Sequence, residues 1–261
     1  MNPSPGLYPA GGRLFWRNHA LWPLLAFSVA FGVIEILGLD RPIARALYFD
    51  GANAHWLGTG PGDWWAHELL HDQGRWLVRG VAAVAILIWL ASFLLPSLRQ
   101  WRAPAGYVGL SMVVATALVG SLKAVTNVDC PWDLAGFGGQ NPYVPLFADR
   151  PDYLPRARCF PGAHAASGFA LMSLYFAARD RAPRLARPFL WVAIMVGCLF
   201  ALGQEARGAH FISHDLVAAA LVWFAVLGLY AWLLKPAAAG SEASLLRQPR
   251  AVTPEPGSGS G

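Results

Sequence analysis

Long apolar runs are the feature that most limits what this chain can fold into. A helix needs about 20 mostly apolar residues to cross the ~30 Å hydrocarbon core of a bilayer. The chain is 56% hydrophobic and only 13% charged, whereas soluble domains carry about 25% charged residues. We therefore expect an all-α integral membrane protein, with a large soluble α-protein as the alternative. The six candidate transmembrane helices lie at roughly residues 20–39, 77–96, 105–124, 162–178, 188–204 and 213–234.

The distribution of Lys and Arg sets the expected orientation. Cytoplasmic loops of membrane proteins carry an excess of these cations. If the N-terminus is cytoplasmic, its side of the membrane holds eleven cations and three acids, and the other side holds nine cations and eleven acids. We therefore expect both termini in the cytoplasm. The net charge of +5 is then a topology signal, and no nucleic-acid partner is expected.

The sequence predicts three regions. Residues 1–18 form a polar lead, 19–235 a membrane domain, and 236–261 a tail rich in Pro, Ala, Gly and Ser that we expect to be disordered. The outer connection 40–75 has paired tryptophans and mixed polarity, which favours an interfacial helix between spans one and two over an ordinary loop. The second outer connection, 125–160, is long, and loops of this length are usually functional.

Polar side chains gather where spans end at the outer face. Lys123 closes the third span, His164 opens the fourth, and residues 204–215 join the fifth to the sixth. Ionisable residues that converge at one membrane face indicate a functional site. A transporter would instead place polar residues and broken helices near span midpoints. A transporter or a non-catalytic lipid-binding membrane protein is therefore the second hypothesis.

The stretch PGAH begins the fourth span. Pro161 suits the first position of a helix, where its missing N–H is not needed. Gly162 and Ala163 would leave N–H groups of the first turn open to an anion, which the helix dipole also favours. His164 would stand beside that anion and exchange a proton with it near neutral pH. On its own, His164 is equally compatible with a histidine that only caps the helix.

A second histidine cluster lies between spans five and six. His210 and His214 are four residues apart and share a face of a helix, and Asp215 follows directly. Lys123 and Arg207 have the chemistry to hold phosphate oxygens. This set suits phosphoryl transfer through a phosphohistidine with no metal or other cofactor. Zinc is the weaker interpretation, because there is no HExxH and the cations would oppose a metal.

At these residues the sequence resembles the type 2 phosphatidic acid phosphatase superfamily, whose motifs are K-x6-R-P, P-S-G-H and S-R-x5-H-x3-D. The stretch KAVTNVDCP, from Lys123 to Pro131, matches the first motif except that Cys130 replaces the arginine. PGAH matches the second with Ser-Gly replaced by Gly-Ala, and QEARGAHFISHD resembles the third. The resemblance spans roughly residues 20–235 and implies a six-helix membrane core.

The resemblance implies a role for each matching residue. His210 would attack phosphorus and form a phosphohistidine, His164 would protonate the leaving oxygen, and Lys123 would bind the phosphate. The substrate would be a lipid phosphomonoester or pyrophosphate, such as undecaprenyl pyrophosphate, a phosphatidate-type lipid or a lipid A phosphate. A lipid phosphotransferase that uses the same site is the alternative, since the sequence does not separate hydrolysis from transfer.

Departures from the third motif leave alternatives open. The arginine position holds glutamine, so Arg207, one helical turn closer to the histidine, or Arg158 would supply the missing charge. The aspartate position, four residues after His210, holds His214. Either His214 orients the nucleophile or Asp215 does so through a local turn. The departures also fit a degenerate member of the family with little activity.

Cysteine usage and composition bear on the compartment. Cys130 and Cys159 lie in the same outer connection, and an oxidising periplasm would join them in a disulfide; two free thiols are the alternative. Cys198 lies within the fifth span and is expected to be unpaired. The bias toward Ala, Arg, Gly and Pro hints at a bacterial source. We therefore expect a multi-pass protein of the bacterial inner membrane with its site facing the periplasm. The oligomeric state stays open.

Overall fold

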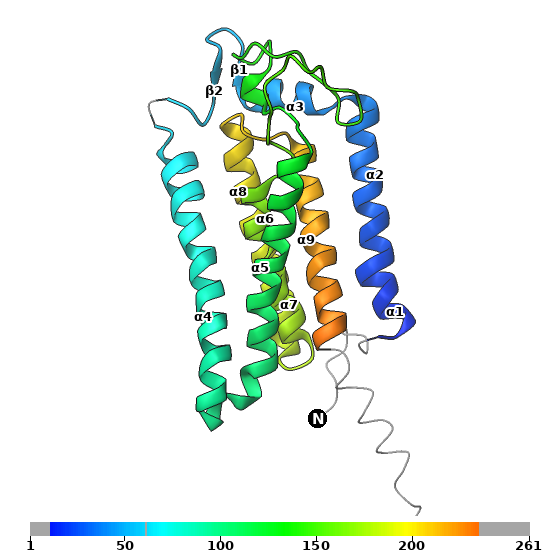
Figure 1. Cartoon of the computed structure of the whole chain (residues 1–261), viewed down its shortest axis with the longest axis vertical. Coiled ribbons are helices and arrows are strands. Elements are labelled where there is room, and N and C mark those ends of the chain that lie inside the picture. The colour runs from blue at the N-terminus through cyan, green and yellow to red at the C-terminus, as the bar shows by residue number, and fades with distance from the viewer. Residues whose placement is uncertain (1–10, 61, 235–261) are drawn as a thin grey trace, which may run out of the picture.

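The computed structural model describes residues 11–60 and 62–234 as a bundle of long helices with a small cap at one end (Figure 1). Two short strands in the cap, β1 (Phe49–Asp50) and β2 (His55–Trp56), pair antiparallel. The helices are α1 (Arg13–Trp16), η1 (Arg17–Leu21), α2 (Trp22–Leu37), α3 (Asp40–Leu47), η2 (Trp65–Gln73), α4 (Gly74–Leu94), η3 (Pro96–Trp101), α5 (Arg102–Val125), η4 (Pro131–Asp133), α6 (Ala163–Phe169), α7 (Met172–Arg179), α8 (Pro183–Ala206) and α9 (Ile212–Leu233).

The described residues contain five helical segments that are long and apolar enough to cross a membrane. Each overlaps one of the runs expected from the sequence. The expected helical class with several candidate membrane spans is confirmed. Several consecutive helices merge into one segment, because η1 runs into α2, η2 into α4 and η3 into α5 without an intervening loop. The five segments are Arg13–Leu37, Trp65–Leu94, Pro96–Val125, Pro183–Ala206 and Ile212–Leu233.

The fourth expected span is divided. It consists of the short helices α6 and α7, with a turn at Ala170 and Leu171 between them. The Leu171 N–H donates to the Gly168 carbonyl, an i→i+3 bond that tightens the chain at the break. Both helices pack against α5 and α8. Neither reaches spanning length alone, so a count of six spans requires the two to cross together and stays a prediction.

The flanking helices turn large apolar side chains outward. On α2, the side chains of Val29 and Ile36 are 64% and 86% exposed, and on α4 those of Leu87 and Leu94 are 62% and 84% exposed. Soluble monomers rarely expose contiguous apolar faces of this extent. The hydrocarbon of a bilayer is the environment that such faces fit.

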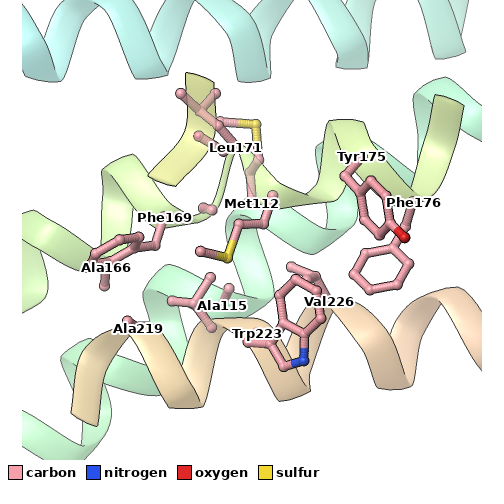
Figure 2. Close-up of a cluster of buried hydrophobic side chains, with 14 of the residues drawn as sticks. Met112, Ala115, Ala166, Phe169, Leu171, Tyr175, Phe176, Ala219, Trp223 and Val226 are labelled. Atoms are coloured by element: carbon pink, nitrogen blue, oxygen red, sulfur yellow. The ribbon is translucent and has the colours of Figure 1, made fainter. Parts of the chain in front are cut away.

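The buried core lies between α5, α6, α7 and α9. Figure 2 shows Met112 and Ala115 of α5 gathered with Phe169 of α6 and with Trp223 and Val226 of α9. All five side chains are buried. This packing fixes α5, α6 and α9 relative to one another, and with them the polar residues at their outer ends.

Glycines allow α8 to approach its neighbours closely. A Cβ at Gly197 of α8 would lie 2.1 Å from the Phe169 ring of α6, and a Cβ at Gly74 of α4 would lie 2.5 Å from the Phe200 ring of α8. Contacts this short are not compatible with a side chain at either position. The start of α4 and the end of α6 are therefore held against the same helix.

The cap packs around its own small hydrophobic cluster. The Trp56 indole N–H donates to the Phe137 carbonyl at 3.2 Å, and the Trp132 N–H donates to the Gly208 carbonyl at 2.9 Å. The first bond joins the two outer connections to each other, and the second ties the second connection to the α8–α9 turn. The buried cluster contains Ala44, Phe49, Trp56, Leu134, Phe137 and Phe211.

The structure leaves the expected interfacial helix and the expected disordered tail as predictions. The stretch expected to form an interfacial helix contributes the π-helix η2, which continues directly into α4; the separate helix in this connection is α3. An interfacial position for either helix stays a prediction. Most of the expected N-terminal lead, residues 1–10, and the expected tail, 236–261, lie outside the described residues.

Candidate active site

A cavity of about 540 Å³ lies between the outer halves of α4 and α5 and the ends of α6 and α8. Lys123, His164 and His210 all line it. They come from the end of α5, the start of α6 and the turn between α8 and α9. The structure therefore brings together three of the residues that the sequence singled out, although 41 and 46 positions separate them along the chain.

His164 is held on three sides. Its ring stacks on Phe200 at 4.5 Å between centroids and lies 4.6 Å from the ring of His71. Its Nε2 lies 3.0 Å from the Leu70 carbonyl of η2, to which it donates as an N–H. The Nδ1 atom is then the ring nitrogen left to exchange a proton. Histidines fixed in this way have a defined tautomer.

His210 and His214 share one backbone acceptor. The Nδ1 of His214 donates to the Cys159 carbonyl at 3.1 Å, and His210 also forms a hydrogen bond with that carbonyl. The two Nδ1 atoms lie 3.5 Å apart. The contact at Nδ1 leaves Nε2 as the His210 ring nitrogen that a nucleophile would use.

The surroundings of His210 favour its neutral form. Burial and the nearby Lys123 ammonium hold the pKa of His210 well below its usual range, more strongly than the bond to Cys159 raises it. A neutral imidazole is the form that attacks an electrophile or binds a proton. In the described part of the chain, no group of three or more His, Cys, Asp or Glu side chains is arranged to hold a metal ion.

The Asp215 carboxyl group packs directly against Gly162. A Cβ at Gly162 would lie 1.8 Å from Asp215 Oδ1, so the carboxyl group occupies the space of the absent side chain. Both Asp215 oxygens are buried and have no hydrogen-bond partner among the described residues. The Gly162 N–H donates to the His214 carbonyl at 3.0 Å. The expectation that this N–H is open to an anion is therefore wrong, whereas Ala163 does line the cavity.

Asp40 anchors the start of α9. Its Oδ1 accepts the Ser213 N–H at 3.1 Å, and its Oδ2 accepts the Ser213 hydroxyl at 2.5 Å. The first N–H groups of a helix lack partners within the helix, and Asp40 of α3 supplies one. Burial raises the pKa of Asp40, and the bonds from Ser213 oppose that rise. The cap thus fixes the turn that carries both histidines.

The two arginines predicted from sequence do not line the cavity. Arg158 is exposed on the outer connection. Arg207 ends α8, where its Cγ would contact a side chain at Gly58, and its charge interacts with those of Asp63 and Asp72.

The sequence did not single out the polar residues that η2 and α4 place in the cavity. Arg75 and Arg79 line it, with His71 one turn before Arg75. Gln204, at the motif position where the family has arginine, also lines it and donates to His71 Nδ1 at 3.0 Å. The available signal was the spacing of four between His71, Arg75 and Arg79, which puts all three on one helix face.

Cys130 and Cys159 form the expected disulfide, and Cys198 is a free cysteine. The disulfide closes a loop with a sequence separation of 29. It also fixes the residue whose carbonyl holds His210 and His214. The rest of the loop is fastened by the Asp129–Arg150 ion pair and by the Cys159 N–H, which donates to the Val128 carbonyl.

Replacing both Cys130 and Cys159 with serine is expected to lower the free energy of unfolding by about 3 to 4 kcal/mol, because the open loop gains chain entropy when the protein unfolds. Thermal unfolding in detergent, followed by tryptophan fluorescence, measures the change. A Cys198→Ser variant is the matched control and should unfold like the native protein. Equal thermal stability of the double variant and the native protein would contradict a closed loop.

Comparisons with known proteins identify the family but no close relative. The family model for the PAP2 superfamily matches residues 104–237. The matched region begins in α5 and includes Lys123, His164, His210 and the whole of α9. Searches of curated proteins and of solved structures find no match.

Proposed function

The chain belongs to the PAP2 superfamily, and on that basis we propose that it is a membrane lipid phosphatase that works through a phosphohistidine. The observation that carries the proposal is that Lys123, His164 and His210 line one cavity. They are a cation, a proton donor and a nucleophile, the groups that phosphoryl transfer to a side chain requires.

In the proposed reaction, His210 Nε2 attacks the phosphorus of the substrate. The N–P bond forms as the P–O bond to the leaving group breaks, and the electron pair goes to the leaving oxygen. His164, protonated on Nδ1, gives its proton to that oxygen. A water molecule then attacks the phosphorus of the phosphohistidine and gives a proton to His164. The new O–P bond forms as the N–P bond breaks, its electron pair returns to His210 Nε2, and inorganic phosphate is released. No metal or other cofactor takes part.

We assign the orientation of the nucleophile to His214 and to the Cys159 carbonyl. His214 Nδ1 lies 3.5 Å from the same atom of His210 and 3.1 Å from Cys159 O. Asp215, the other candidate, directs its carboxyl group at Gly162. Asp215 is then a packing and electrostatic neighbour of the site, and His214 is the positioning residue.

Phosphate binding is assigned first to Lys123. Its ammonium neutralises charge on the transferred phosphate in the low-dielectric cavity, where such stabilisation is strong. The Ala163 backbone lies at the cavity wall. Arg207 is a weaker candidate and Arg158 weaker still, because neither lines the cavity.

The proposed site opens toward the outer, periplasmic side of a bacterial inner membrane. The arginines near the far end of the bundle support this orientation, since cations mark the cytoplasmic side. They are Arg13 of α1, Arg17 of η1, Arg99 of η3, Arg102 at the start of α5, and Arg181 and Arg184 around the start of α8. Both ends of the described helical bundle, the start of α1 and the end of α9, lie at that same end (Figure 1).

A lipid phosphotransferase is the alternative activity of the same site. It shares the phosphohistidine and differs only in the acceptor, which would be a lipid hydroxyl instead of water. Adding a candidate acceptor lipid to the assay distinguishes the two. A transferase converts the acceptor to its phosphate, whereas a phosphatase releases inorganic phosphate at an unchanged rate.

The first test is phosphate release in detergent, measured with phosphatidate, a polyprenyl diphosphate and a lipid A phosphate as substrates. We expect release from at least one of them. We also expect an excess of EDTA to leave the rate unchanged, because the proposed reaction uses side chains only. Loss of activity in EDTA that returns with a divalent cation would contradict the mechanism. Binding of lipid phosphates with no turnover by a folded protein would favour a non-catalytic lipid-binding protein.

A further inference from the structure

We propose that α4 supplies a second anion-binding subsite, formed by Arg75 and Arg79, which holds a second phosphate of the substrate next to the catalytic histidines. The inference rests on the proposed function and narrows its substrate class. It assigns the site to lipids whose head group carries two adjacent phosphates. Neither arginine belongs to the region that the family model matches, which begins at residue 104.

The geometry of α4 supports the subsite. His71, Arg75, Val78, Arg79 and Ala82 all line the cavity. Their spacings of three and four residues place them on one face of a helix. The face that η2 and α4 turn toward the site therefore carries His71, Arg75 and Arg79 at its outer end and the apolar Ala82 below them.

The charges in the cavity exceed what one phosphate group requires. Lys123, Arg75 and Arg79 line the cavity, and within the described residues no Asp or Glu does so. Several cations facing one cavity with no lining acid are expected to bind a multiply charged anion. Lys123 lines the same cavity as His210 and its charge acts on that ring, so it serves the transferred phosphate. The arginine pair is left for another anionic group.

Both arginines retain unused binding capacity. Arg75 donates from Nη2 to Asp72 at 2.7 Å, but its buried Nε has no hydrogen-bond partner among the described residues. The guanidinium of Arg79 is exposed and lies 5.1 Å from the Trp76 ring. Guanidinium groups bind phosphate through paired N–H donors.

The position of the pair fits the leaving side of the reaction. Arg75 lies one turn after His71, and the His71 ring contacts His164, the proposed general acid. In a diphosphate, attack of His210 on the terminal phosphorus breaks its bond to the bridging oxygen. The electron pair stays on that oxygen, which becomes part of a lipid monophosphate. Arg75 and Arg79 would stabilise the charge that develops there, and His164 would supply the proton.

The depth of the cavity fits a lipid tail below the two phosphates. Lys123 lies near the outer end of α5, and Thr116, Val113 and Met112 of the same helix line the cavity further in. Seven residues of helix span about 10 Å. The cavity therefore changes from cationic to apolar along its depth, in the same order as a phosphorylated amphiphile.

Binding of two matched probes tests the subsite without requiring turnover. The probes are a farnesyl methylenebisphosphonate and a farnesyl phosphonate, which share a tail and differ in the second phosphorus group. We expect Arg79→Gln to weaken the bisphosphonate about 10- to 100-fold, the effect of losing one or two charged hydrogen bonds, and to change phosphonate affinity less than about threefold. The double variant R75Q/R79Q should bind the bisphosphonate more weakly still. Arg79→Lys should bind it more tightly than Arg79→Gln does.

Controls separate this inference from the proposed function. Arg184→Gln, at the opposite end of the bundle, should leave the affinity for both probes unchanged. His210→Ala should still bind the bisphosphonate while losing turnover. Equal weakening of both probes by Arg79→Gln, or no weakening of either, would overturn the subsite even if the native enzyme is active. If the variants change binding of the two probes as expected but the native protein releases no phosphate, the proposed function is overturned instead.

Discussion

The His210→Ala variant is expected to release phosphate at least about 10³-fold more slowly than the native protein, because the only proposed nucleophile is gone and the reaction cannot be divided into two steps. The fold should survive, since alanine removes a ring next to an existing cavity rather than filling space. Phosphate release in detergent measures the rate. A rapid quench under alkaline conditions with ³²P-labelled substrate measures the phosphoenzyme, which should be absent from the variant.

The matched control is His55→Ala, in the cap strand β2, where the side chain is exposed. It should show native rates and native phosphoenzyme levels. His164→Ala provides a further distinction. This variant lacks the proposed general acid, so it should be slow with lipid phosphates. It should be much more active with p-nitrophenyl phosphate, whose leaving group needs no proton. A labelled phosphoenzyme in the His210→Ala variant would show that another residue is the nucleophile.

Gly162→Ala is expected to lower kcat/KM by about 10- to 100-fold, the cost of displacing catalytic groups by roughly 1 Å. The added methyl group would lie 1.8 Å from Asp215 Oδ1, and Asp215 is only 3% exposed, so the clash must move either the carboxyl group or the start of α6. His164 is two residues away. The Gly162 N–H also donates to the His214 carbonyl, so both histidine-bearing segments shift.

The same substitution is expected to reduce the free energy of unfolding by about 1 to 3 kcal/mol, the usual effect of overpacking. The double variant G162A/D215G should recover most of the stability, because removing the carboxyl group makes room for the methyl group. A double-mutant cycle measured by thermal unfolding gives the coupling between the two positions. Additive effects would show that the two side chains do not compete for space.

Asp215→Asn in the same series decides between the two candidates for orienting the nucleophile. If His214 and the Cys159 carbonyl hold His210, Asp215→Asn should leave kcat within about tenfold of the native value, and His214→Ala should lower kcat further. A larger loss for Asp215→Asn than for His214→Ala would assign the orienting role to Asp215.

The membrane class and the central residues of the site were predictable from the sequence because they rest on local patterns. Apolar runs identify helices that cross a bilayer, whatever their neighbours. Lys123, His164 and His210 were predictable because each lies at a span end on the same side of the membrane. Counting the membrane crossings is enough to show which span ends lie on the same side, and so which residues can meet there.

The remaining features depend on contacts between distant segments. Nothing in the stretch around Arg75 shows that its helix faces Lys123, since that depends on how α4 packs against α5. The use of the Gly162 N–H by the His214 carbonyl likewise depends on the turn before α9. The break between α6 and α7 is missed by a hydropathy pattern because the residues on both sides of it are equally apolar.

The sharing of the Cys159 carbonyl by His210 and His214 would have a consequence for the maturation of an enzyme that works as we propose. In the proposed mechanism, the atom that aligns the nucleophile belongs to Cys159, which is covalently linked to Cys130. A newly made chain with reduced thiols would carry every catalytic side chain and still lack the alignment. Oxidation of the outer loop, after it has crossed the membrane, would then be the step that switches the protein on, which would keep it idle on the side where it is synthesised.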